Sequence, residues 1–295
     1  MVRHFFGVLA LALAAQVAPA QTSVDRTIPL NSDGAIRIYA LAGTVTVRAW
    51  DRDAVTIRGT LGAGNRLHAG GGRTAIKAFV ESSNEEQPEA STLEIMVPAN
   101  AKVWIKTATA GIVVSGVTGS LDTYAVGGSI RVTGNPADVN AEAIDGDIEI
   151  NGNPGWVRAK SASGSVLLRG SSSDATLTSV TGRVVIDGKP GGPRFERARF
   201  ETVTGDIRFT GRIERGADIR FDSHGGSIDV ALTRDASADL DISTISGRIS
   251  NAFTSARPVS GRYGRGFALT TSAGDGGARL SVRTFKGNIT LRRST

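Results

Sequence analysis

Residues 110–127 read AGIVVSGVTGSLDTYAVG, and the next three segments of equal length read GSIRVTGNPADVNAEAID (128–145), GDIEINGNPGWVRAKSAS (146–163) and GSVLLRGSSSDATLTSVT (164–181). Each segment opens with alanine or glycine, which we call the anchor. An aliphatic residue follows two and four positions after the anchor, and glycine follows six positions after it. A pattern that returns at a fixed short period indicates stacked units, each of which buries its apolar face against its neighbours.

The same pattern continues outside this stretch. It returns at five more anchors downstream and one upstream: Gly182, Gly205, Gly226, Gly247 and Gly287, and Gly43. Apolar residues also recur seven, five and two positions before each anchor, and we interpret all three columns as inward-facing. Alternating apolar residues predict strands, and the glycines between them predict bends. The predicted fold is all-β, a parallel single-chain β-solenoid (β-helix-like) of about ten coils with an N-terminal β capping section. At about 4.8 Å per coil, the rod would be about 50 Å long.

The pattern also suggests an order along the chain. We expect residues 1–20 to be a signal peptide, residues 21–100 to form the N-terminal β section and first coil, and residues 101–295 to form the β-solenoid repeat domain. The coil of Gly287 would come last, after a hairpin-like pair at residues 267–271 and 279–284. Arg292 and Arg293 would then discourage further pairing at that end of the rod.

The signal peptide prediction rests on three features of residues 1–20. Arg3 and His4 are basic, residues 7–15 are apolar, and Ala18-Pro19-Ala20 provides small residues for cleavage. The apolar segment is shorter than the ~20 residues of a membrane-spanning helix. The chain contains no cysteine, which excludes disulfides and thiol chemistry. The formal net charge of +6 is spread along the chain without a basic and aromatic cluster, so no nucleic-acid partner is expected.

Acidic residues offer one candidate catalytic group. Asp145, Asp147 and Glu149 are the densest set of carboxylates, and Asp206 falls in the same column as Asp147. A polysaccharide lyase or hydrolase on a β-helix would use such carboxylates for acid/base chemistry or to hold a metal. The alternative is a solvated bend in which Arg131 lies opposite Glu149 one coil away. We favour the bend, and we assign no catalytic, cofactor-binding or metal site and no cofactor. The aspartate column of calcium-binding β-rolls is missing.

Three other features carry weaker hypotheses. Leu167 and Val185 are predicted to point outward on adjacent coils, and we expect the insertion 188–199, with Phe195, to fold over them. His224 is expected to be a hydrogen-bonded core residue or a register slip, because its column is apolar. A basic and aromatic segment is interpreted as a flexible connection, with contact to anionic glycans or lipid headgroups as the alternative; it contains Arg257, Arg262, Tyr263 and Arg265.

Three segments together resemble a known family. They are GTVTVRAWD (43–51), LEIMVP (93–98) leading into residues 103–114, and the turns Gly-Asp-Ile or Gly-Ser-Ile at 146–148, 205–207 and 226–228. They resemble the bacterial putative-adhesin β-strand-repeat family, domain of unknown function 4097. The resemblance covers nearly the whole chain after residue 20. It implies a β-solenoid on an exported or envelope protein, without established catalytic residues.

The sequence therefore favours an exported, non-enzymatic β-solenoid that acts as an envelope scaffold or adhesin-like binding module, in the periplasm or at the cell surface. Its partner would be an envelope glycan or protein. Two alternatives remain: a carbohydrate-active β-helix enzyme (polysaccharide lyase or hydrolase), and a polymer-forming structural protein. The oligomeric state stays open.

Overall fold

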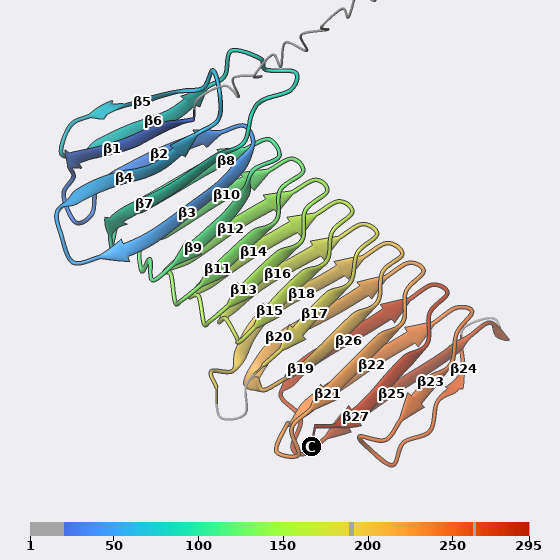
Figure 1. The fold of residues 1–295 in the computed structure, drawn as a ribbon. Helices are drawn as coiled ribbons and strands as arrows, with labels where there is room; N and C mark the ends of the chain where they lie inside the picture. The colour runs from blue at the N-terminus through green and yellow to red at the C-terminus, as the bar shows by residue number, and fades with distance from the viewer. Residues whose placement is uncertain (1–20, 189–191, 262–263, 295) are drawn as a thin grey trace, which may run out of the picture.

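The computed structural model describes residues 21–188, 192–261 and 264–294, and the predicted signal peptide lies outside them. The described residues form two long sheets that face each other along a rod (Figure 1). In spatial order, sheet A contains β1 (Thr22–Pro29), β4 (Ala54–Leu61), β7 (Ser91–Pro98), β3 (Gly43–Trp50), β9 (Gly111–Ser115), β11 (Ile130–Thr133), β13 (Ile148–Asn151), β15 (Val166–Arg169), β17 (Val184–Asp187), β19 (Ile207–Gly211), β21 (Ile228–Leu232), β27 (Ile289–Arg293) and β23 (Ile249–Asn251). Sheet B contains β24 (Val259–Ser260), β25 (Phe267–Ala273), β22 (Ala238–Thr244), β26 (Ala278–Thr284), β20 (Ile213–Ser223), β18 (Phe195–Thr202), β16 (Asp174–Ser179), β14 (Trp156–Ser161), β12 (Asp138–Ala143), β10 (Ser120–Ala125), β8 (Lys102–Thr107), β2 (Ala35–Ala40), β6 (Ala75–Glu81) and β5 (Arg66–Gly71).

Each coil contributes one strand to each sheet. The strand before the anchor lies in sheet B and the strand after it lies in sheet A, as for β12 and β13 around Gly146. The residues two positions after the anchor pair in parallel register from coil to coil and are buried: Ile112, Ile130, Ile148, Val166 and Val184. The predicted all-β solenoid of stacked parallel coils is thus confirmed. No helix long and apolar enough to span a bilayer occurs in the described parts of the chain.

The anchors are glycine because the coils touch at this corner. A Cβ atom placed on Gly146 would lie 1.9 Å from the carbonyl oxygen of Gly128 in the neighbouring coil. A hydroxyl three positions before the anchor fastens the same corner. The Ser161 hydroxyl donates to the Gly146 carbonyl at 2.9 Å and accepts from the N–H of its own anchor, Gly164, at 2.9 Å. Ser179 repeats both bonds one coil later, so buried serine and threonine satisfy the backbone groups at the bend.

The core is one continuous cluster of apolar side chains between the two sheets, and it includes residues from Leu30 to Leu291. The interval between anchors lengthens to 23 residues at Gly205. There four fully buried phenylalanines contact each other, with ring centroids 5.2–6.2 Å apart: Phe195, Phe200, Phe209 and Phe221. The extra residues therefore bring an additional aromatic ring into the core.

At the N-terminal end the chain order and the spatial order differ. Strands β2 and β3 form the first coil in the chain, yet the coil of β6 and β7 stacks outside them, while β8 and β9 continue on the inner side. Antiparallel strands close this end: β4 pairs with β7, β1 pairs with β4, and β5 pairs with β6. The predicted N-terminal capping section is thus present, and it ends the parallel stack.

At the C-terminal end, too, the spatial order of the coils differs from their order in the chain, so the predicted order is wrong. The coil of β26 and β27, which contains Gly287, inserts between the coil of β20 and β21 and that of β22 and β23. In Figure 1 the red strand β26 accordingly lies between β20 and β22. The predicted hairpin is absent from these described strands, because β22 separates β25 from β26. The prediction that Arg292 prevents further pairing at the end of the rod is wrong, because β27 lies between β21 and β23. Arg292 forms an ion pair with Asp229 at 3.1 Å.

Candidate functional site

One corner of the rod carries a row of exposed apolar side chains. They stand two positions before the anchor, and we call the row the corner ridge; in spatial order it contains Val126, Ile144, Ala162, Val180, Val203, His224, Phe285 and Ile245. Its six large apolar side chains are between 39% and 45% exposed. The prediction that this column faces inward is wrong. The residues seven, five and three positions before the anchor alternate inward in the strand of sheet B, so the residue that follows, two positions before the anchor, points outward where the turn starts.

The spacing of the corner ridge is fixed by the backbone. The N–H of seven of the eight ridge residues, all except Ile245, bonds a carbonyl of the preceding coil, as in Ile144 to Ala125 at 3.1 Å and Val203 to Val180 at 3.1 Å. With strands about 4.8 Å apart, the eight residues span about 34 Å. The ridge residues are thus held at the spacing of the coils along the rod.

His224 belongs to this ridge and not to the core. Its ring is exposed and stacks on Phe285 of the neighbouring coil, with centroids 5.0 Å apart and planes 6° apart. The predicted core histidine is therefore a surface residue. The prediction failed because it assumed that the apolar column of His224 faces the core, whereas the whole column faces the solvent.

The acidic residues do not meet in a common site. Asp145 accepts a hydrogen bond from the Ser163 hydroxyl at 3.0 Å, and Asp147 accepts one from the Ser165 N–H at 2.7 Å. Each of these bonds fastens one coil to the next. Asp147 and Asp206 are three coils apart, about 14 Å.

Asp206 and Glu149 have similar structural contacts. Asp206 repeats the role of Asp147 by accepting from the Ser227 N–H at 2.8 Å, which explains the recurrent Gly-Asp-Ile turns. Glu149 lies between Arg131, at 3.2 Å, and Arg169 on the outer face of sheet A. The predicted pairing of Arg131 with Glu149 is confirmed. Among the residues that the structure describes, no group of three potential metal ligands occurs.

Two weaker hypotheses concern other surface features. Leu167 and Val185 pair in register and are half-buried on the outer face of sheet A, as predicted. Phe195 does not cover them, because it is fully buried against Phe200 and Phe209.

The basic segment can be placed only in part. Arg257 and Arg265 are exposed, whereas Arg262 and Tyr263 lie outside the described residues.

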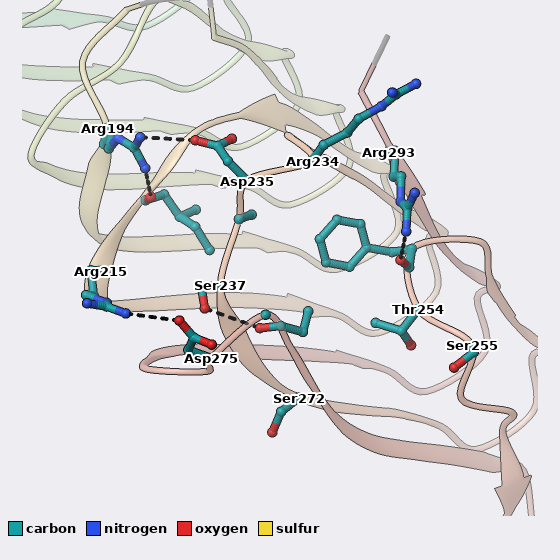
Figure 2. Close-up of a pocket in the computed structure, with 15 residues that line it drawn as sticks. Arg194, Arg215, Arg234, Asp235, Ser237, Thr254, Ser255, Ser272, Asp275 and Arg293 are labelled. Atoms are coloured by element: carbon teal, nitrogen blue, oxygen red, sulfur yellow. Dashed lines mark hydrogen bonds and ion pairs between the residues drawn. The ribbon is translucent and has the colours of Figure 1, made fainter.

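A cavity of about 640 Å³ opens near the C-terminal end of the rod (Figure 2). Four arginines and two aspartates line it: Arg194, Arg215, Arg234, Arg293, Asp235 and Asp275. This site could not be found from the sequence because its walls come from six separate segments. The inserted coil of β26 and β27 brings these segments together.

Comparison with known proteins supports the fold. A putative lipid binding protein from Parabacteroides distasonis has a similar structure, with a TM-score of 0.51 and 10% sequence identity, over 91% of this chain and 96% of that one. A putative adhesin from Bacteroides fragilis aligns over 94% of this chain and 100% of that one, with a TM-score of 0.48 and 12% identity. The search of curated proteins found no match.

At 10% identity the Parabacteroides neighbour shows a shared fold and nothing more. The family assignment comes from the sequence itself. The family model described as Toastrack DUF4097 matches residues 35–292, and the chain belongs to this family.

Proposed function

We propose that the protein is an exported, non-enzymatic scaffold or adhesin-like binding module of the envelope, and that it contacts a protein partner along the corner ridge. The observation that carries this proposal is the row of six large apolar side chains, each about two-fifths exposed, along eight successive coils. Monomeric proteins rarely expose extended apolar surface unless it serves an interaction. Export is proposed from the features of residues 1–20.

The chemistry of the ridge favours a protein over a glycan. Valine and isoleucine side chains offer no hydrogen bond to sugar hydroxyls, and apolar contacts with a polar rim are typical of protein interfaces. The flanking positions are mostly glycine, serine and threonine.

The residues beside the ridge also argue against a lipid surface as the partner. This alternative arises because the Parabacteroides neighbour is described as a putative lipid binding protein. The charges beside the ridge are mixed: Asp145 and Asp147 are acidic, and Arg183 and Lys286 are basic. Binding to anionic lipid relies on clustered basic residues, so a protein partner is the better match.

A ridge variant tests the proposal. The purified protein, fluorescently labelled, is titrated onto immobilised envelope fraction from the bacterium that produces it. Ile144→Ser, Val180→Ser and Val203→Ser together are expected to weaken saturable binding at least about tenfold, because three aliphatic side chains lose their burial against the partner. Leu167→Ser with Val185→Ser removes apolar surface from the outer face of sheet A and is the matched control; we expect its affinity to equal that of the parent.

Treatment of the envelope fraction separates the partner classes. Protease digestion of the fraction should abolish binding, whereas periodate oxidation of its glycans should leave binding intact. Equal affinity of the ridge variant and the parent would contradict the proposal. Binding that survives protease and is lost on periodate treatment would assign the partner to the glycans instead.

The enzymatic alternative predicts a difference that we do not expect. Since Asp147 is engaged with the Ser165 N–H and the other acids lie apart, Asp147→Ala should match the parent on acidic polysaccharides, with no product formed by either protein. Release of reducing ends and of unsaturated uronates measures hydrolysis and lyase activity. Turnover by the parent that Asp147→Ala lacks would establish the enzyme instead.

A further inference from the structure

The cavity near the C-terminal end is a preformed concave site. Its walls are Arg194 just before β18, the start of β20, the segments 234–237 and 253–255, the turn 272–275 and the end of β27 (Figure 2). A volume of about 640 Å³ lies within the range of small-molecule sites. All of these segments belong to the end of the rod where the last coil is inserted. The cavity is therefore a product of the fold and not of one flexible loop.

The charges that line the cavity do not balance. The four arginines exceed the two aspartates by two positive charges. Asp235 is paired with Arg194 at 3.2 Å, and Asp275 is paired with Arg215 at 3.6 Å. The pKa of Asp235 is lowered, first by a hydrogen bond from Thr233 and further by Arg194. Both aspartates thus neutralise arginines on one side of the cavity.

The other side keeps unneutralised arginines. Within the described residues, Arg234 and Arg293 have no carboxylate within 4.0 Å. Figure 2 shows both on the side of the cavity away from Arg194 and Arg215, with the exposed Arg234 side chain extending outward from the rim. Arg293 uses one guanidinium nitrogen to donate to the Phe253 carbonyl at 3.3 Å. A guanidinium has five N–H donors, so most of its capacity is left for an incoming anion.

The remaining lining suits a sugar. Both hydroxyls and apolar atoms line the cavity, the former from Ser237, Thr254, Ser255 and Ser272 and the latter from Ile213, Ala236, Phe253 and Ala273. The Ser237 hydroxyl donates to the Gly276 carbonyl at 3.0 Å, which leaves its lone pairs free to accept from a ligand hydroxyl. Hydroxyls match sugar hydroxyls, and apolar atoms match the C–H face of a pyranose ring.

We infer that this cavity binds an acidic saccharide, with the carboxylate, sulfate or phosphate of the sugar held by Arg234 and Arg293. Arginine binds such groups through two parallel charge-assisted hydrogen bonds. This site is separate from the corner ridge and adds a glycan-binding function to the protein-binding function proposed above.

Calorimetric titration of the purified full-length protein tests this inference. The probes are digalacturonate, a sulfated disaccharide, the neutral disaccharide cellobiose, inorganic sulfate, and phosphatidylglycerol vesicles. We expect the acidic disaccharides to bind and cellobiose not to bind. Arg234→Gln with Arg293→Gln should weaken that binding at least about tenfold, because charge-assisted hydrogen bonds are lost. Both side chains are exposed, so the variant should fold as the parent does.

Matched variants make the result specific. Arg257→Gln with Arg265→Gln removes the same charge from exposed positions outside the cavity, and it should keep the affinity of the parent. The ridge variant should keep it as well, so failure of one proposal is distinguishable from failure of the other. Equal binding by the Arg234/Arg293 variant would overturn the inference. So would sulfate binding as tight as that of the disaccharides, which indicates a simple anion site, or binding to the vesicles alone, which indicates a lipid headgroup site.

Discussion

Gly146→Ala is expected to destabilise the rod by about 3 kcal/mol or more, because the added methyl group has no space. Its Cβ atom would lie 1.9 Å from the carbonyl oxygen of Gly128 and 2.6 Å from the carbonyl carbon. Those atoms are backbone of the adjacent coil, so no side chain can rotate away. The two coils would have to separate and lose the parallel hydrogen bonds between them. The midpoint of urea unfolding, followed by far-ultraviolet circular dichroism, measures the effect.

Gly127→Ala is the matched control for this change. Gly127 stands at the same corner, but the nearest atom to its Cβ would be the Thr109 methyl group at 3.7 Å, an ordinary contact distance. We expect its stability to lie within about 0.5 kcal/mol of the parent. If both alanine variants were equally stable, close contact between coils would not be the reason for glycine at the anchors.

Phe200→Ala should cost about 3–5 kcal/mol of unfolding free energy, the range for removal of a buried aromatic ring. Phe200 is fully buried, and its ring lies 5.2 Å from that of Phe221 and 5.7 Å from that of Phe209. Its removal leaves a cavity in the part of the core where four rings pack together. The expected result is a large fall in the urea midpoint at constant protein concentration.

Phe285→Ala is the corresponding surface change. Phe285 is 43% exposed on the corner ridge and contacts His224 by ring stacking. Its removal should cost less than about 1 kcal/mol, since most of the lost contact is one aromatic pair. A Phe285→Ala variant as unstable as Phe200→Ala would place this column in the core, as its apolar character alone suggests.

The residues after each anchor could be predicted from the sequence for a simple physical reason. Ile130, Ile148 and Val166 alternate with outward residues inside regular strands, and the constant interval of 18 residues forces them into register. The residues seven and five positions before the anchor could be predicted to face inward for the same reason. The repeat period and the alternation together determine the register and the inward face of a strand whose two neighbours carry the same pattern.

The column two positions before the anchor could not be read in the same way. Val126 and Ile144 are apolar, and apolarity alone gives no direction once the strand has ended. One signal was available: the serine and threonine three positions before the anchor, as at Ser161 and Ser179, make poor core residues unless they bond the backbone of a bend. The bend then turns the next residue outward. An apolar residue in this place is therefore a surface feature.

The repeat pattern could not predict the spatial order of the last coils or the cavity. The interval of 40 residues between Gly247 and Gly287 allowed a missing coil, and nothing in the local sequence showed that the last coil inserts before its predecessor. Arg194, Arg234 and Arg293 lie on different segments, and only that insertion brings them around one cavity. The aspartates of the Gly-Asp-Ile turns, in contrast, were visible but ambiguous, because a capping carboxylate and a catalytic one look alike in sequence.

Distances along the corner ridge test the central claim most directly, and the absence of native cysteine makes spin labelling clean. One label replaces Val126, and the second replaces either Phe285 or Ile245. The stacking order predicts about 29 Å for the pair 126/285 and about 34 Å for the pair 126/245, with mobile spectra typical of surface sites. The pair that is farther apart in sequence should thus be nearer in space. Pulsed electron paramagnetic resonance that gives the reverse order, or spectra of immobilised labels, would contradict both the inserted last coil and the exposed ridge.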